Sequence, residues 1–144
     1  MIIKFLGLEV EAERHFEQDY VWAPDTILRV KGRRGAITLH GPGPEQVAAE
    51  LARPLIVTRH AGLVDHLRAE WPETSDWEVK PHASAEDVRG RVVVGVLPAH
   101  LAALTMLHVE IPLDMTQAQR GAELDANAVR AIAGAPRIYA VDGI

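Results

Sequence analysis

Cysteine is absent from this sequence of 144 residues. Its absence excludes disulfide scaffolds, zinc ribbons, iron–sulfur clusters and catalysis by a thiol, because all of these use that side chain. Long apolar runs are also missing, and none approaches the ~18 residues that a membrane-spanning helix needs. The first ten residues carry one lysine and then one glutamate, Glu9, which is not the order of a signal peptide. We therefore expect a cytoplasmic protein that does not bind membranes.

Basic residues are outnumbered, since 15 Lys and Arg oppose 20 Asp and Glu and give a net charge of -5 with histidine neutral. Proteins that coat duplex nucleic acid are usually basic, because their affinity comes from Lys and Arg that displace counterions. We therefore expect no binding to duplexes. Only Lys4, Lys31 and Lys80 are lysines, so an anion site would use arginine, whose guanidinium can form two parallel hydrogen bonds.

Common cofactor and metal motifs are missing too. The chain contains no G-x-x-x-x-G-K-[ST], no G-x-G-x-x-G and no G-x-S-x-G, so NTPase, dinucleotide-binding and serine hydrolase functions are not supported. Its seven histidines are at positions 15, 40, 60, 66, 82, 100 and 108. No two of them have the H-x-x-x-H spacing of a zinc-binding helix. We expect neither a cofactor nor a metal, and leave open a histidine cluster assembled in three dimensions.

The length suits one compact domain, since 144 residues with 48% apolar content can bury roughly two thirds of the surface of the unfolded chain. Residues 1–54 form an extension of mixed character. Within it, Thr26–Val30 and Ala36–His40 are β-type runs joined by a short glycine-containing link, which predicts a β-hairpin. After the break GPGP, Glu45–Ala52 has the composition of a short helix.

From residue 55 onward, predicted strands and helices alternate. Strands are expected at Leu55–Thr58, Trp77–Val79, Arg91–Val96, Leu107–Leu113 and Ile138–Val141, and helices at Gly62–Glu70, His100–Thr105 and Asp125–Ala133. This alternation is typical of βαβ units, which build a mostly parallel sheet. We predict an α/β fold in which residues 55–144 form such a sheet flanked by helices, preceded by the β-rich extension.

Three segments place polar or turn residues where predicted strands end. They are Thr58–Gly62, Leu97–His100 and the pair Leu113 and Asp114. In open α/β sheets, ligands bind at the carboxyl ends of the strands, where loops and helix N-termini converge. The three segments therefore predict a ligand-binding site.

The segment Thr58–Gly62 has the chemistry of a phosphate site. Arg59 offers a bidentate fork, and His60 can exchange a proton near neutral pH. Gly62 permits a tight turn into the free N–H groups of the next helix. The alternative is an ordinary loop in which Thr58 or His60 caps that helix. Histidine phosphatases also carry an arginine–histidine pair after a strand, but their glycine follows directly, and here Ala61 intervenes.

The second and third segments have weaker signals. Leu97 and Pro98 offer a surface for a flat base that His100 would face, and the alternative is simple packing of a helix on the sheet. Asp114 could orient a ribose hydroxyl. Arg120 could reach a phosphate or form a surface ion pair with Glu123 worth at most ~1 kcal/mol.

These motifs together resemble the small CRISPR-associated proteins of the Csx-sixteen family, which occur with type III CRISPR systems. The matching segments are Val57–Gly62, His82, Gly95–Ala102, Ile111–Asp114 and Arg120–Leu124. The resemblance covers about residues 55–141. It implies a Rossmann-like domain related to the CARF sensors, and a ring nuclease that binds and degrades cyclic oligoadenylate.

The implied chemistry needs no metal, because the ribose 2′-OH of the substrate can serve as the internal nucleophile. On this hypothesis Arg59 and His60 are catalytic: Arg59 binds the phosphate, and His60 either takes the proton or forms a hydrogen bond to the phosphate. The ligand-binding residues are then Thr58, Gly62, His82, Gly95, Leu97, Pro98, His100, Asp114 and Arg120. We expect cyclic tetra-adenylate as the ligand and a homodimer, because a symmetric ring suits two identical sites.

Two other functions remain as alternatives. The chain could sequester or sense the ring without cleaving it, since both functions need the same pocket. It could also be a phosphatase-like phosphoesterase, which would require a second histidine facing His60, with His100 and His108 as the candidates.

Overall fold

The computed structural model describes residues 1–14 and 27–144. It contains two compact units, Met1–Ala52 and Arg53–Ile144, which we describe separately. The division of the sequence into an extension and a core within one domain stays a prediction. None of the helices in the described ranges has the length and apolar content needed to cross a membrane.

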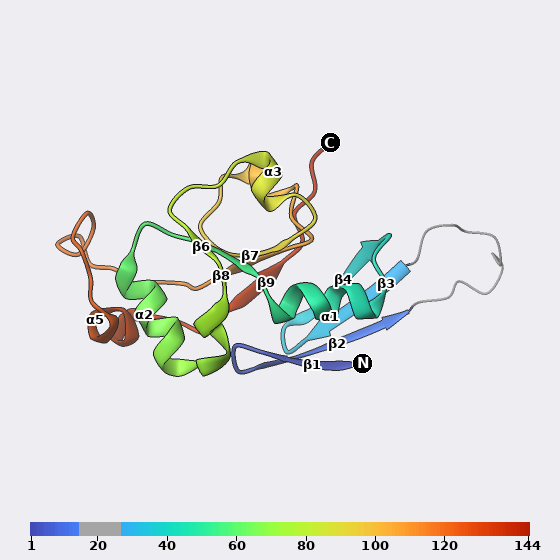
Figure 1. Cartoon of the computed structure of the whole chain (residues 1–144), viewed down its shortest axis with the longest axis horizontal. Helices are drawn as coiled ribbons and strands as arrows, with labels where there is room; N and C mark the ends of the chain where they lie inside the picture. Colours follow the sequence, from blue (N-terminus) through green and yellow to red (C-terminus); the bar gives the residue numbers. More distant parts are fainter. Residues whose placement is uncertain (15–26) are drawn as a thin grey trace. The chain divides into compact units, whose positions relative to one another are not determined.

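The first unit is an antiparallel sheet with one helix (Figure 1). Its strands are β1 (Ile2–Phe5), β2 (Leu8–Arg14), β3 (Ile27–Gly32) and β4 (Gly35–His40), followed by the helix α1 (Pro44–Ala52). The predicted hairpin is confirmed as β3 and β4, and its first predicted residue, Thr26, lies outside the described residues. Helix α1 was also predicted, and it contacts β1 and β2.

Strands β1 and β2 were not predicted, because residues 2–10 look like one continuous apolar run. The run is interrupted by a two-residue turn at Leu6 and Gly7, both of which have positive φ. This turn type matches the twist of a hairpin and pairs Phe5 with Leu8.

The second unit is a five-stranded sheet in the order β6-β5-β7-β8-β9. Strands β5 (Leu55–Val57), β6 (Val79–Lys80), β7 (Val92–Gly95) and β8 (Leu107–Glu110) are parallel, and β9 (Arg137–Tyr139) is antiparallel to β8. The predicted α/β fold with a mostly parallel sheet is therefore confirmed. The short helices are α2 (Ala61–Glu70), η1 (Pro72–Asp76), α3 (Ala85–Val88), α4 (Ala99–Ala102) and α5 (Ala126–Ile132).

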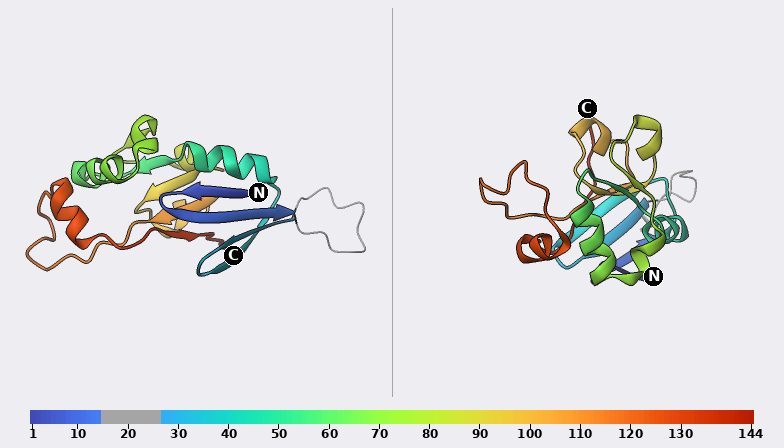
Figure 2. Two further views of the ribbon diagram at one scale, coloured as in Figure 1. Left: turned by 90° about the horizontal axis from the view of Figure 1, so that it is seen from below. Right: turned by 60° about the vertical axis from the view of Figure 1, so that its left-hand side comes forward.

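Helices flank this sheet in two pairs. Helix α2 packs against α5, and α3 packs against α4 on the other side of the sheet (Figure 2). Because both faces are covered, the central strands are apolar throughout, and every residue of β5 and β7 is buried. This explains why β7 gave the clearest strand signal in the sequence.

The strand order creates a switch point beside β5. The strand that follows it, β6, lies on one side, and the next one, β7, lies on the other side. At such a point the loops leave the sheet in opposite directions, and a crevice opens at the carboxyl ends of the strands. The fold therefore brings the loops after β5, β6 and β7 to one edge.

Candidate functional site

A cleft of about 700 Å³ lies in the second unit at the carboxyl edge of the sheet. Its volume is within the range of small-molecule sites. The residues that line it follow β5, β6, β7 and β8: Val57, Thr58, Arg59, His60, Leu63, Pro81, His82, Ala83, Gly95, Val96, Leu97, Pro98, Leu101, Glu110, Ile111, Leu113 and Met115. Most of these side chains are apolar, and the titratable ones are Arg59, His60, His82 and Glu110.

The cleft brings together most of the residues predicted to form the site. Those that line it are Thr58, Arg59, His60, His82, Gly95, Leu97 and Pro98. They come from three loops separated by up to 40 positions in the sequence. Their convergence follows from the strand order, since β5 lies between β6 and β7.

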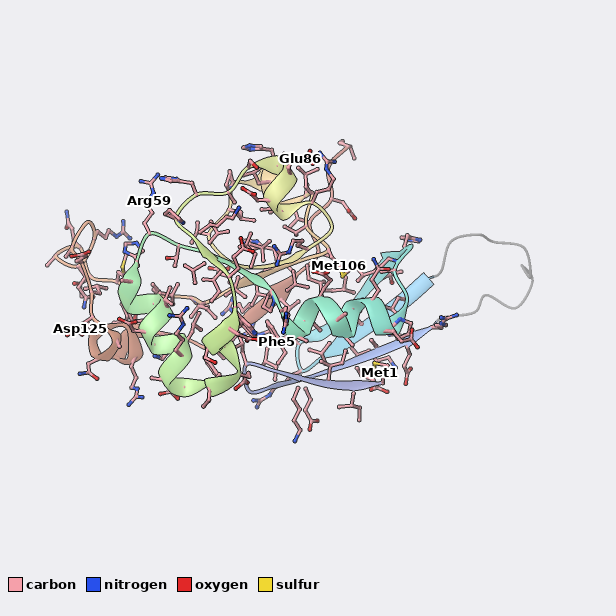
Figure 3. All side chains as sticks on the ribbon, viewed as in Figure 1. Met1, Phe5, Arg59, Glu86, Met106 and Asp125 are labelled. Carbon is pink, nitrogen blue, oxygen red and sulfur yellow. The ribbon has the colours of Figure 1, made fainter. Side chains whose placement is uncertain are left out.

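Arg59 and His82 contact each other within the cleft. Figure 3 shows the Arg59 side chain extending from the loop between β5 and α2. Its Nη2 lies 3.3 Å from Nδ1 of His82. A guanidinium can only donate, so the imidazole accepts at Nδ1 and carries its proton at Nε2. The contact orients the arginine fork and leaves an N–H donor on His82.

The loop that carries His82 is anchored at both ends. Lys80, the last residue of β6, donates to Asp87 Oδ1 at 2.8 Å. Asp87 also accepts from the backbone N–H of Ser84 at 2.8 Å and forms a capping box with it at the start of α3. The hydrogen bond from Lys80, followed by those from Ser84, lowers the pKa of Asp87 to about 2. Asp87 is therefore ionised at neutral pH, and its hydrogen bonds with Lys80 and Ser84 hold the loop in place.

His60 occupies the N-cap position of α2, and its side chain makes no capping hydrogen bond. Its backbone N–H donates instead to Oγ1 of Thr58 at 3.1 Å, which forms a local turn. The alternative in which His60 caps the helix therefore does not apply. His60 lines the cleft, as does Arg59.

Gly95 ends β7 with a φ of +134°, and a Cβ at this position would collide with the backbone carbonyl of Val57. Its own carbonyl accepts from Nε2 of His108 at 2.6 Å. The chain can thus turn sharply and present Leu97 and Pro98 to the cleft. His108 is used for this backbone contact and does not line the cleft among the described residues.

Gly62 and His100 also lie outside the cleft lining. Gly62 is buried where α2 meets α5, and a Cβ there would collide with the carbonyl of Leu124, so its small size serves packing. His100 is exposed on α4, whereas its neighbour Leu101 faces the cleft. Of the six histidines within the described ranges, His60 and His82 are the two that line the cleft.

Asp114 and Arg120 are both exposed and do not line the cleft. The backbone near Asp114 is extended, and its N–H donates to the carbonyl of Ile132 at 2.9 Å. Because side chains alternate along extended chain, Leu113 and Met115 line the cleft and Asp114 does not.

The sequence reasoning missed Glu110 and much of the apolar wall. Glu110 is the last residue of β8, and Ile111, Leu113 and Met115 follow it along the cleft. The strand predicted there ran from Leu107 to Leu113, three residues past the observed end at Glu110, so the sequence carried no signal that Glu110 ends a strand. Among the residues that the structure describes, no three His, Asp or Glu side chains gather into a set that could hold a metal ion.

The fold defines an α/β protein with a cleft at the switch point of a mostly parallel sheet. The family model described as "Putative CRISPR-associated protein (Cas_VVA1548)" matches residues 55–142. This range is more than half of the chain, and the chain belongs to that family of CRISPR-associated proteins. The predicted association with CRISPR is thereby confirmed. No curated protein and no solved structure matches the chain.

Proposed function

We propose that this protein is a ring nuclease, which binds cyclic oligoadenylate in the cleft and linearises it, as its resemblance to the Csx-sixteen family and the CARF sensors implies. The ribose 2′-OH attacks the adjacent phosphorus, a 2′-O–P bond forms, and the P–O5′ bond breaks. The products are a 2′,3′-cyclic phosphate and a 5′-hydroxyl. Removal of the ring would switch off type III CRISPR signalling.

The observation that carries this proposal is the meeting of Arg59, His60 and His82 in one cleft whose other lining residues are mostly apolar. A phosphodiester needs charge stabilisation and a proton acceptor, and the nucleobase needs apolar walls. The arginine and the histidines supply the charge stabilisation and the proton acceptor, and the apolar residues of the cleft supply the walls. The chain also belongs to a family of CRISPR-associated proteins.

Each polar group has a role in the proposed reaction. Arg59 binds the phosphate oxygens and stabilises the charge that builds up as the 2′-oxygen attacks. His60 accepts the proton of the 2′-OH, and the departing 5′-oxygen takes up a proton from water, which gives the 5′-hydroxyl. His82 donates a hydrogen bond from Nε2 to a phosphate oxygen while its Nδ1 holds the guanidinium. Because the nucleophile belongs to the substrate, the protein mainly has to align it with the departing oxygen.

Cyclic tetra-adenylate is the proposed substrate, and a homodimer is the proposed assembly. A four-fold ring presents the same groups to two clefts related by a two-fold axis. Sedimentation with and without the ring tests this. We expect a two-chain species that binds one ring, and one ring per single chain would contradict the assembly.

Incubation of the purified protein with cyclic tetra-adenylate in excess EDTA tests the activity, with products resolved by chromatography and mass spectrometry. We expect linear products that end in a 2′,3′-cyclic phosphate. An intact ring that co-elutes with the protein would instead indicate a sponge or sensor. An intact ring that does not bind would contradict the proposal and favour the phosphoesterase alternative.

A further inference from the structure

Glu110 is the only carboxylate among the residues that line the cleft in the part of the chain that the structure describes. It ends β8, whereas Arg59, His60 and His82 follow β5 and β6. In the order β6-β5-β7-β8, two strand spacings separate β5 from β8, which is roughly 10 Å. The cleft therefore has two ends. Arg59 and His82 supply hydrogen-bond donors at one, which we call the donor end, and Glu110 supplies a hydrogen-bond acceptor at the other, which we call the acceptor end.

No structural contact accounts for the Glu110 side chain. Within residues 1–14 and 27–144 it takes part in none of the ion pairs or side-chain hydrogen bonds. Arg137 lies directly opposite in the register of β8 and β9, yet the two form no ion pair. The nearest histidine on the strand, His108, is bound to the carbonyl of Gly95. The carboxylate is half-buried and free to accept a hydrogen bond from a ligand.

The wall between the two ends is apolar. Leu97 and Pro98 follow β7, which lies between β5 and β8, and they line the cleft there and offer contacts to a flat ring. A phosphate would be repelled by Glu110 and attracted by Arg59, so electrostatics fix the direction of a bound nucleotide. Its phosphate lies at the donor end, and the edge of its base faces the carboxylate.

We propose that Glu110 recognises the base, by accepting a hydrogen bond from its exocyclic amine. This inference rests on the proposed function and deepens it, because it identifies the amine of adenine as the group that the cleft selects. A carboxylate accepts from an amine and repels a carbonyl oxygen at the same position. A site built to bond a polar group discriminates strongly against the analogue that lacks it.

The test compares two rings, cyclic tetra-adenylate and the same ring with unsubstituted purine, which lacks the amine. Dissociation constants and kcat/KM are measured for both rings with the wild-type protein and with Glu110→Gln and Glu110→Leu. Glu73→Gln is the matched control, because it neutralises an exposed carboxylate that does not line the cleft. Circular dichroism spectra of all variants establish that each one is folded.

We expect the wild-type protein and the control to prefer the adenine ring by about ten- to a hundredfold, as for a hydrogen bond to a charged group. Glu110→Gln keeps part of this preference through its amide oxygen, and Glu110→Leu loses it. A preference that is unchanged in Glu110→Leu would overturn the inference.

The two proposals fail in different ways in this experiment. If both rings bind and stay intact, cleavage is contradicted, and the ratio of dissociation constants still decides the role of Glu110. If the wild-type protein cleaves both rings equally, only the inference about Glu110 is overturned. If neither ring binds, both proposals are overturned.

Discussion

Arg59 is the residue whose replacement separates transition-state stabilisation from binding. Arg59→Ala removes the fork that would hold the phosphate during attack, so we expect kcat for cyclic tetra-adenylate to fall by about 10²- to 10³-fold. The dissociation constant should rise much less, because the apolar wall still holds the base. Arg59→Lys should recover only part of the rate, since an ammonium cannot form two parallel hydrogen bonds.

Single-turnover rates and equilibrium titration measure the two effects separately. Arg68→Ala is the control, because Arg68 is exposed on α2 and does not line the cleft. Equal losses of rate and affinity in Arg59→Ala would assign this residue to binding alone.

Gly95 shows at the residue scale how the backbone shapes the cleft. In Gly95→Ala the new Cβ would overlap the carbonyl of Val57 and the residue would keep a strained φ, so the sheet must shift where β7 ends. We expect the free energy of unfolding to fall by more than ~2 kcal/mol. Gly90→Ala is a matched control, because Gly90 also has positive φ but has open space at its Cβ, and its cost should be about 1 kcal/mol. Urea denaturation of both variants checks this difference, and equal costs would refute the role of the Val57 contact.

His66 is a buried histidine that makes the fold sensitive to acid. It is 5% exposed, it packs edge-on against Trp71, and its Nδ1 has no hydrogen-bond partner among the described residues. Burial lowers its pKa below the usual 6.5, with Glu70 opposing and Arg130 reinforcing the effect. The unfolded chain therefore takes up a proton near pH 6.5 before the folded chain does. Stability is lost as the pH falls through that value.

We expect His66→Phe to reduce this loss, because phenylalanine fills the site without a titrating nitrogen. Urea denaturation at about pH 7.5 and about pH 5.5 gives the free energies of unfolding. The difference between the two pH values should be smaller in His66→Phe than in the wild-type protein, and unchanged in His100→Phe, whose histidine is exposed. A His66→Phe variant with the wild-type pH dependence would contradict the assignment.

At the scale of elements, the anchored loop between β6 and α3 holds His82 beside Arg59. Asp87→Asn keeps the size of the side chain but removes the charge that binds Lys80, so we expect the loop to loosen. Turnover should fall, and hydrogen exchange should become faster in residues 81–84. Glu86→Gln is the control, because Glu86 is an exposed neighbour on α3 whose carboxylate pairs with Arg89 and not with Lys80. Faster hydrogen exchange without any loss of turnover would show that the anchoring of this loop does not contribute to the reaction.

Local patterns predicted elements well where they were continuous. The β-branched run of β7 and the helices α1 and α2 were located to within about two residues, because their patterns depend on neighbours in the sequence. Strands β1 and β2 were missed because a turn at Leu6, a residue that rarely takes positive φ, carries no sequence signal. Helix α4 ends at Ala102, earlier than its composition predicted.

The site was predictable only in part, for a related reason. The residues at strand ends, such as Arg59 and Leu97, could be assigned to the sheet edge without knowing which strands are neighbours. The contact of Arg59 with His82 depends on β6 lying beside β5, which is a property of strand order. Glu110 was missed because its place in the cleft depends on β8 lying beside β7, which is again a property of strand order.

At the scale of the whole molecule, all residues that line the cleft lie between Val57 and Met115, inside the second compact unit. The family match, residues 55–142, covers almost the same unit. That unit has its own core, which includes Leu55, Val88 and Val93. A unit with its own core and a complete site is expected to fold and act without the rest of the chain.

We therefore expect a fragment of residues 53–144 to unfold cooperatively and to cleave cyclic tetra-adenylate at a rate close to that of the full chain. Thermal unfolding followed by circular dichroism tests the first expectation, and kcat/KM in EDTA tests the second. A fragment that folds but loses activity would show that residues 1–52 contribute to the substrate site or to the assembly, and sedimentation of the fragment would distinguish these. A fragment that does not fold would show that the second unit depends on the antiparallel sheet for its stability, because its own core would then be too small to offset the conformational entropy of its chain.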